Sequence, residues 1–211
     1  VRYDTPTVAG FTASASWGED DFWEIALRYA KEFSGFKLAL GAGYSEFTVE
    51  NVTGPLPTGS KKDSKFFQAG GYLQHLASGL FVHAAYGHED NSDTTIVTLN
   101  DPAVTPPDSH HWYVKAGIRR AWTPLGATII YGDYAEYIDQ VGPNALGLGV
   151  ESSTFRRSGA TIAQEIDAAS MTIYLKYDHY EADVSGKNLE LNGVTGLEDA
   201  DFVSLGALIN F

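Results

Sequence analysis

The last segment of the chain alternates apolar with small or polar residues along its whole length. Within residues 202–211, Val203 and Leu205 are apolar, whereas Ser204 between them is polar. Successive side chains of a strand point to opposite faces, so this pattern gives one apolar and one polar face. The final residue, Phe211, continues the apolar face. A strand of this kind that ends in an aromatic is typical of a transmembrane β-barrel, whose outward face meets lipid.

Period-two alternation recurs in about ten segments of strand length, each bounded by turn residues. The residues predicted to share the apolar face are Phe11, Ala13, Ala15, Trp17, Trp23, Ile25, Leu27, Tyr29, Phe36, Leu38, Leu40, Ala42, Tyr44, Leu80, Val82, Ala84, Tyr86, Trp112, Val114, Ala116, Ile118, Ala160, Ile162, Ile166, Met171, Ile173, Leu175 and Tyr177. Residues 65–75 and 80–88 are less regular, and residues 127–137 have ambiguous parity. The sequence predicts an all-β fold, one transmembrane antiparallel β-barrel domain over residues 1–211.

Composition excludes several other classes. Charged residues make up 19% of the chain, and no apolar run approaches the ~18 residues that a membrane helix needs. The formal net charge of −13 argues against a nucleic-acid partner, which would require a basic patch to neutralise phosphates. The absence of cysteine fits passage through an oxidising periplasm.

The connections between the segments give a second, independent signal. Counted back from the C-terminus, long polar stretches alternate with tight turns. The long stretches are 183–199, 138–154, 89–109 and 48–64, and the short ones are 167–169, 122–126, 76–79 and 33–35. Strict alternation is typical of barrels whose short turns face the periplasm and whose long loops face outside. The acidic hairpin at 18–21 is short although it belongs to the long-loop side.

Several short motifs together resemble the C-terminal portion of the general porin family of Gram-negative outer membranes. The motifs are residues 1–6 with 9–11, residues 79–87, residues 126–131, residues 164–167 and the terminal Phe211. The resemblance implies a trimeric, water-filled diffusion channel in the bacterial outer membrane, with no enzymatic activity and no cofactor. It also implies contact with membrane lipid and lipopolysaccharide, and a role for Phe211 in the signal that the barrel assembly machinery recognises.

The chain departs from the family in its number of strands. Porins close about sixteen strands, whereas this sequence contains about ten plus a stub at residues 1–4. We therefore expect the early strands and the inward-folded constriction loop of the family to lie outside this sequence, which begins with Val1 and carries no signal sequence. The alternative is an unusually small barrel, since natural barrels begin at eight strands.

Charged residues on the predicted lumen face are the candidates for function. The predicted pore-lining residues are Glu24, Arg28, Lys37, Lys115, Arg119, Arg157, Lys176 and Asp178, and Glu165 shares their parity. Opposed acidic and basic walls would create a transverse field that orients solutes and sets ion preference. In the alternative interpretation, these side chains only keep the lumen wall hydrated. The family resemblance implies that a basic wall cluster faces acidic groups of the constriction loop.

Aromatic residues near the predicted strand ends are expected at the membrane interface, where a ring with one wet edge is stable. They are Trp23, Tyr29, Phe36, Tyr44, Trp112, Trp122 and Tyr177. No metal site is predicted, because the adjacent His110 and His111 would point to opposite faces of a strand. Acidic runs such as 19–21 are expected to be solvated loops, although they could bind Ca²⁺.

Two alternative functions remain open from the sequence. An outer-membrane hydrolase similar to the omptins would need paired acids and a His–Asp couple at the outer rim, where His88, Glu89 and Asp90 lie. No sequence spacing predicts the Ser–His couple that a barrel phospholipase would need. A soluble calycin-like barrel would instead line a ligand cavity with the apolar residues.

The terminal aromatic gives the first testable prediction. Deleting Phe211 should reduce the yield of folded barrel in the outer membrane far more than Asn210→Ala, because only Phe211 belongs to the predicted assembly signal. The yield is measured as the heat-modifiable species on gels. A deletion variant that assembles at the wild-type level would contradict the assignment.

Overall fold

The protein forms a single antiparallel β-sheet. The computed structural model describes residues 1–19, 21–50, 60–97, 105–141, 150–186, 189 and 197–209. Eleven strands follow one another in chain order, each hydrogen-bonded to the next. They are β1 (Arg2–Asp4), β2 (Phe11–Trp17), β3 (Trp23–Phe33), β4 (Phe36–Glu50), β5 (Lys61–His75), β6 (Leu80–Asp90), β7 (Ser109–Thr123), β8 (Gly126–Ile138), β9 (Val150–Ile166), β10 (Met171–Gly186) and β11 (Ala200–Ile209).

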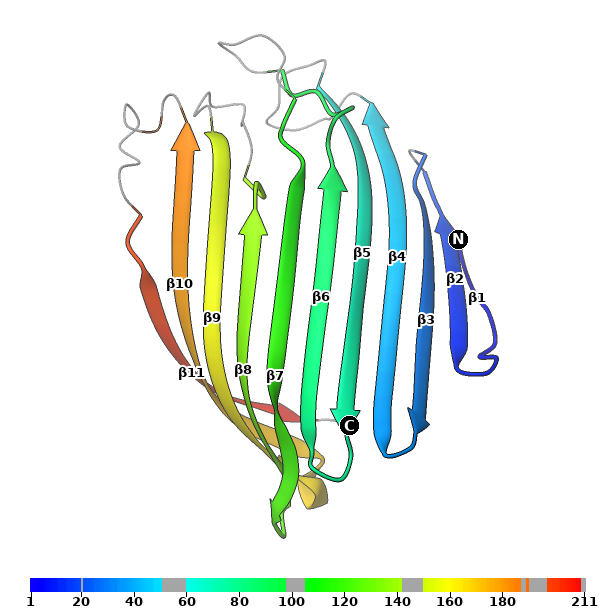
Figure 1. The fold of residues 1–211 in the computed structure, drawn as a ribbon. Helices are drawn as coiled ribbons and strands as arrows, with labels where there is room; N and C mark the ends of the chain where they lie inside the picture. Colours follow the sequence, from blue (N-terminus) through cyan, green and yellow to red (C-terminus); the bar gives the residue numbers. More distant parts are fainter. Residues whose placement is uncertain are drawn as a thin grey trace.

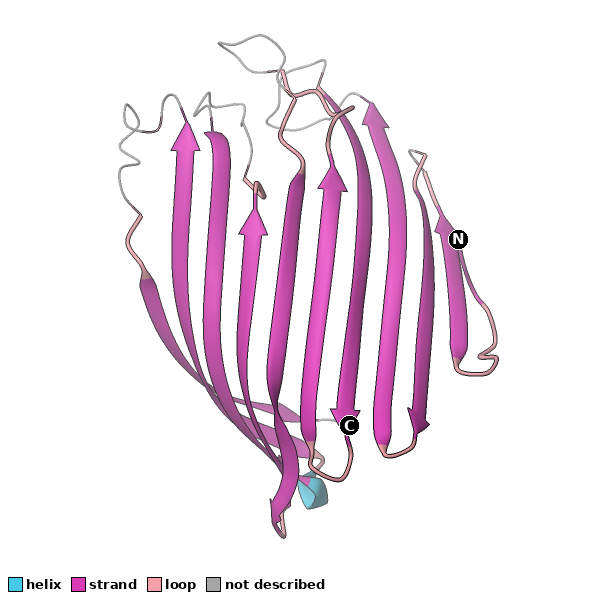
Figure 2. Cartoon of the chain, viewed as in Figure 1, coloured by secondary structure: helices cyan, strands magenta, loops and turns pink. Residues whose placement is uncertain are grey.

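The sheet is one layer thick and strongly curved, with β11 wrapping behind the other strands (Figure 1). The tight turns lie together at the lower edge, where a short 3₁₀ turn, η1 (Asp167–Ala169), joins β9 to β10 (Figure 2). Ser34 and Gly35, between β3 and β4, both have positive φ, as a two-residue hairpin turn of type I′ requires. The predicted short turns are therefore confirmed in the described chain.

The strands extend further from this edge than the alternation predicted. β4 continues to Glu50, and β5 begins at Lys61, although residues 48–64 were expected to form a loop. β9 likewise starts at Val150, and β10 continues to Gly186. Backbone ladders need no apolar side chains, and cross-strand polar pairs stabilise these ends; Ser152 Oγ lies 2.7 Å from Ser185 Oγ.

Cross-strand register assigns every strand residue to one of two faces. Ile25 lies opposite Ala15 and Tyr44, and the same face continues without interruption from β2 to β11. The two faces predicted from alternation are therefore the two faces of the sheet. The ambiguous segment is also assigned, because Ile130 of β8 lies opposite Ile118 and Ile162 on the apolar face.

Solvent exposure distinguishes the faces. On the polar face, Asp133, Thr161 and Asp178 are at most 7% exposed. On the apolar face, Ile25, Leu27 and Leu175 are 52%, 51% and 48% exposed. Side chains converge on the inside of a curved sheet and spread on its outside, so the polar face is concave and the apolar face convex. A calycin-like barrel would have the opposite arrangement, and that alternative is therefore wrong for this fold.

The two edge strands remain unpaired with each other. In the described residues, β1 pairs only with β2, and β11 pairs only with β10, so the sheet is not closed. Among the described residues, no helix is both long and apolar enough to span a membrane.

Close packing of β7 against β8 generates a stability prediction. A Cβ added to Gly117 would lie 2.6 Å from Tyr131 Cβ and would clash with the Ile130 carbonyl oxygen. Gly117→Ala should therefore cost about 1–3 kcal/mol through overpacking, measured by urea unfolding followed by circular dichroism. Gly41→Ala is the control, because the nearest atom to its new methyl would be 4.0 Å away. Equal stability of the two variants would contradict the packing.

Candidate functional site

All eight predicted pore-lining residues lie on the concave face. β3 carries Glu24 and Arg28, which face Ser45 and Gly41 of β4. The others are Lys37 of β4, Lys115 and Arg119 of β7, Arg157 of β9, and Lys176 and Asp178 of β10. Six of these eight are basic. Asp133, Glu165, Glu32 and Glu89 share this face. The concave face is therefore a charged surface of both signs that spans most of the sheet.

Arg157 forms the centre of a compact ion-pair cluster. Its Nη2 donates to Asp133 Oδ2 of β8, and its Nε lies 3.8 Å from Asp178 Oδ1 of β10. Lys176 Nζ lies 2.8 Å from the same Asp178 oxygen. The Asp133 and Asp178 side chains are only 1% and 7% exposed. Buried carboxylates require such partners, because desolvation otherwise strongly disfavours their charged form.

Gly159 makes this cluster possible. It lies directly opposite both Asp133 and Asp178, and a Cβ there would be 3.0 Å from Asp133 Oδ1 and 2.9 Å from Asp178 Oδ1. The missing side chain therefore lets two carboxylates from neighbouring strands converge on one arginine. Both of these oxygens are buried; Asp178 Oδ1 has the Lys176 ammonium 2.8 Å away, whereas Asp133 Oδ1 has no hydrogen-bond partner among the described residues.

The remaining charges are more dispersed. Arg119 donates from both Nε and Nη2 to the Glu165 carboxylate of β9, with 3.1 Å between Nε and Oε1. Lys37 and Glu32 lie 3.9 Å apart and are both more than half exposed. Arg28 donates to Ser14 Oγ at 3.2 Å. The structure therefore brings Arg157, Lys176 and Asp178 together and leaves Glu24, Arg28, Lys37 and Lys115 apart.

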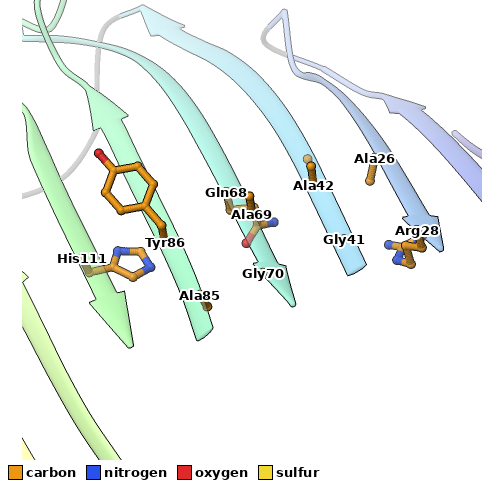
Figure 3. Close-up of a pocket in the computed structure, with 11 residues that line it drawn as sticks. Ala26, Arg28, Gly41, Ala42, Gln68, Ala69, Gly70, Ala85, Tyr86 and His111 are labelled. Carbon is orange, nitrogen blue, oxygen red and sulfur yellow. The ribbon is translucent and has the colours of Figure 1, made fainter. Parts of the chain in front are cut away.

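Small residues line a hollow on the concave face of β3 to β6. Arg28, Gly41, Gly70 and Ala85 form one cross-strand row. The hollow has a volume of about 270 Å³, and Figure 3 shows Arg28 and His111 at its two ends. Because Gly and Ala project little from the sheet, this part of the wall leaves room for solvent beside a cationic side chain.

The predicted interface aromatics lie on the convex face, with Trp122 in the bulged end of β7. Trp23, Phe36 and Trp112 occupy strand ends. Tyr29, Tyr44 and Tyr177 were also expected near strand ends but lie well inside β3, β4 and β10, because these strands extend further than predicted. Phe211 lies outside the described residues.

The convex face also carries a polar network that sequence analysis missed. His179 Nδ1 of β10 lies 2.8 Å from Asp201 Oδ1 of β11, which also accepts from Tyr177 Oη at 2.6 Å. Ser158 of β9 lies opposite His179, but His179 Nε2 lies 3.4 Å from Glu181 Oε1. The row therefore contains a His–Asp couple without a serine bound to the imidazole. His179 and Asp201 lie on consecutive strands and are 22 residues apart, so no short sequence motif pointed to this network.

The other histidine candidates are separated by the sheet. His110 lies on the convex face near His88, and His111 lies on the concave face, stacked on Phe66 with ring centroids 6.0 Å apart. His88 and Glu89 also point to opposite faces, and Glu89 accepts from Ser64 Oγ at 2.6 Å. Within the described ranges, no group of three or more His, Cys, Asp or Glu side chains is arranged to hold a metal.

Asp133 is the main concave-face residue that sequence analysis did not identify. It lies in the segment of ambiguous parity, where Ile129 and Ile130 are adjacent and both apolar. Its face is shown by its cross-strand partners, Lys115 of β7 and Gly159 of β9, which both lie on the concave side. Strand pairing, and not the local sequence, therefore determines which face Asp133 occupies.

Comparison with protein-family models and with curated protein sequences gives no match. Among solved structures, the outer-membrane expressed OmpT of Vibrio cholerae aligns with a TM-score of 0.48 at 12% identity, covering 86% of this chain and 53% of that one. The β domain of the Bordetella autotransporter BrkA aligns with a TM-score of 0.42 at 15% identity, covering 83% and 74%. The chain thus spans about half the length of the Vibrio protein. Similarity at this level decides neither function nor closure of the sheet.

Two adjacent arginines on opposite faces provide a matched test of the cluster. Arg157→Gln should cost about 3–5 kcal/mol, because it leaves the buried Asp133 carboxylate without its cation. Arg156→Gln should cost less than about 1 kcal/mol, because its Glu136 and Asp183 partners are accessible to solvent. Urea unfolding followed by circular dichroism measures both. Similar losses in the two variants would contradict the central role of Arg157.

Proposed function

We propose that this chain forms part of the wall of a water-filled pore in the bacterial outer membrane, through which small hydrophilic solutes and ions diffuse passively. The observation that carries the proposal is the contrast between the two faces. The convex face exposes large apolar side chains such as Leu27 and Leu175, while the concave face carries the ion-paired Arg119, Arg157 and Lys176. A one-layer sheet with these faces suits lipid outside and water inside.

Strand length supports a transmembrane orientation. β9 contains 17 residues and β5 contains 15, whereas a tilted strand needs only about 9–11 residues to cross the hydrocarbon core. The strands therefore span the membrane and extend beyond it on the side of the long connections. The protein does not act as an enzyme in this proposal, and it needs no cofactor.

A membrane barrel has to pair every strand edge, because unpaired backbone groups are too costly in lipid. We therefore propose that further strands pair with β1 and β11 to complete the ring.

The basic residues would set the ion preference of the pore. Fixed charges on a low-dielectric wall focus the potential and raise the local concentration of counter-ions. Arg119 and Lys176 are paired with Glu165 and Asp178. Neutralising the two cations would therefore also leave negative charge on the wall uncompensated. Arg28 and Lys37 contribute positive charge nearer the other end of the sheet.

Planar-bilayer recordings of the native protein test the proposal. Replacing Arg28, Lys37, Arg119 and Lys176 together by Gln should shift the reversal potential toward cation preference. Raising the salt to 1 M should shrink the shift, because the Debye length falls to ~3 Å. The matched control replaces Arg156, on the convex face, by Gln.

Two outcomes would contradict the function. The absence of ohmic channels in the wild-type protein would exclude a diffusion pore. An unchanged reversal potential at low salt in the fourfold variant would show that these side chains do not face the conducting path.

A further inference from the structure

A second hollow on the concave face combines aromatic walls with two cationic side chains. It has a volume of about 310 Å³ and is lined by Tyr72 of β5, Phe81 and His83 of β6, Lys115 and Arg119 of β7, and Ile129 and Tyr131 of β8. This volume is at the lower end of the roughly 300–1,000 Å³ range of small-molecule sites. Gly117 lies opposite both Phe81 and Tyr131, so no side chain separates these two rings along β7.

Lys115 has no carboxylate within ion-pair distance among the described residues. It lies opposite Asp133 in the ladder, but the Asp133 carboxylate is held by Arg157. The Lys115 ammonium instead lies over the Tyr131 ring, 4.8 Å from its centroid, and 6.0 Å from the Tyr113 centroid. The other neighbouring cation, Arg119, is paired with Glu165. The hollow therefore presents one uncompensated positive charge beside aromatic surface.

We infer that this hollow binds small carboxylates that carry an aromatic or compact apolar body. The carboxylate would pair with the Lys115 ammonium in a charge-assisted hydrogen bond, and the body would pack against Phe81, Ile129 and Tyr131. A fully hydrated inorganic anion would be attracted by the Lys115 ammonium but would make no apolar contact with the walls. The inference rests on the proposed function, because solutes reach the hollow through the lumen.

Isothermal titration of the detergent-solubilised full chain with benzoate tests the inference. Benzoate should bind at least about 10-fold more tightly than acetate, because acetate lacks the ring. Lys115→Gln should weaken benzoate binding about 10-fold or more, and Lys115→Arg should restore it to within about 3-fold of wild type. Lys37→Gln is the matched control, because Lys37 lies on the same face and is 54% exposed, outside the hollow.

Each result decides the inference. Binding that follows the predicted order supports it, provided that circular dichroism shows folded variants. Undetectable benzoate binding, equal binding by wild type and Lys115→Gln, or equal binding of acetate and benzoate would overturn it. Because titration does not require conduction, wild-type protein that binds benzoate as predicted but forms no channels would overturn the pore proposal alone. Channels without Lys115-dependent binding would overturn this inference alone.

Discussion

The antiparallel backbone ladder is the constraint on which the rest of the structure depends. Each strand from β2 to β10 is hydrogen-bonded on both sides, so its backbone polar groups are satisfied within one layer of chain. With the backbone paired, the side chains are free to face two different environments at every second residue. The exposed Leu27 and the buried Asp133 are both consequences of that single geometry.

The sequence predicted the faces of the sheet better than the lengths of its strands. Side-chain alternation depends on local geometry, so the apolar set from Phe11 to Tyr177 could be assigned without knowledge of neighbours. Strand ends such as Glu50 and Val150 depend on pairing with the next strand, and their polar residues give no periodic signal. Asp133 was missed for the same reason, because adjacent isoleucines obscure its parity.

The sequence also did not predict which charged side chains contact one another on the concave face. Parity alone placed Arg157, Lys176 and Asp178 on one side, but it could not show that they meet around Gly159 with Asp133. Burial of two carboxylates is tolerable there because cations from β9 and β10 compensate them. Lys115 lies opposite Asp133, but the Asp133 carboxylate is already paired with Arg157. Lys115 therefore has no carboxylate partner among the described residues.

Spin labels at residues 112–116 and 118 of β7 would test the two-solvent account most directly in reconstituted vesicles. Labels at Val114, Ala116 and Ile118 on the convex face should collide with lipid-dissolved oxygen, and labels at Tyr113 and Lys115 on the concave face with a water-soluble nickel complex. The two accessibilities should therefore alternate out of phase with a period of two residues. Access of the nickel complex to both faces alike, or the reverse phase, would contradict the account.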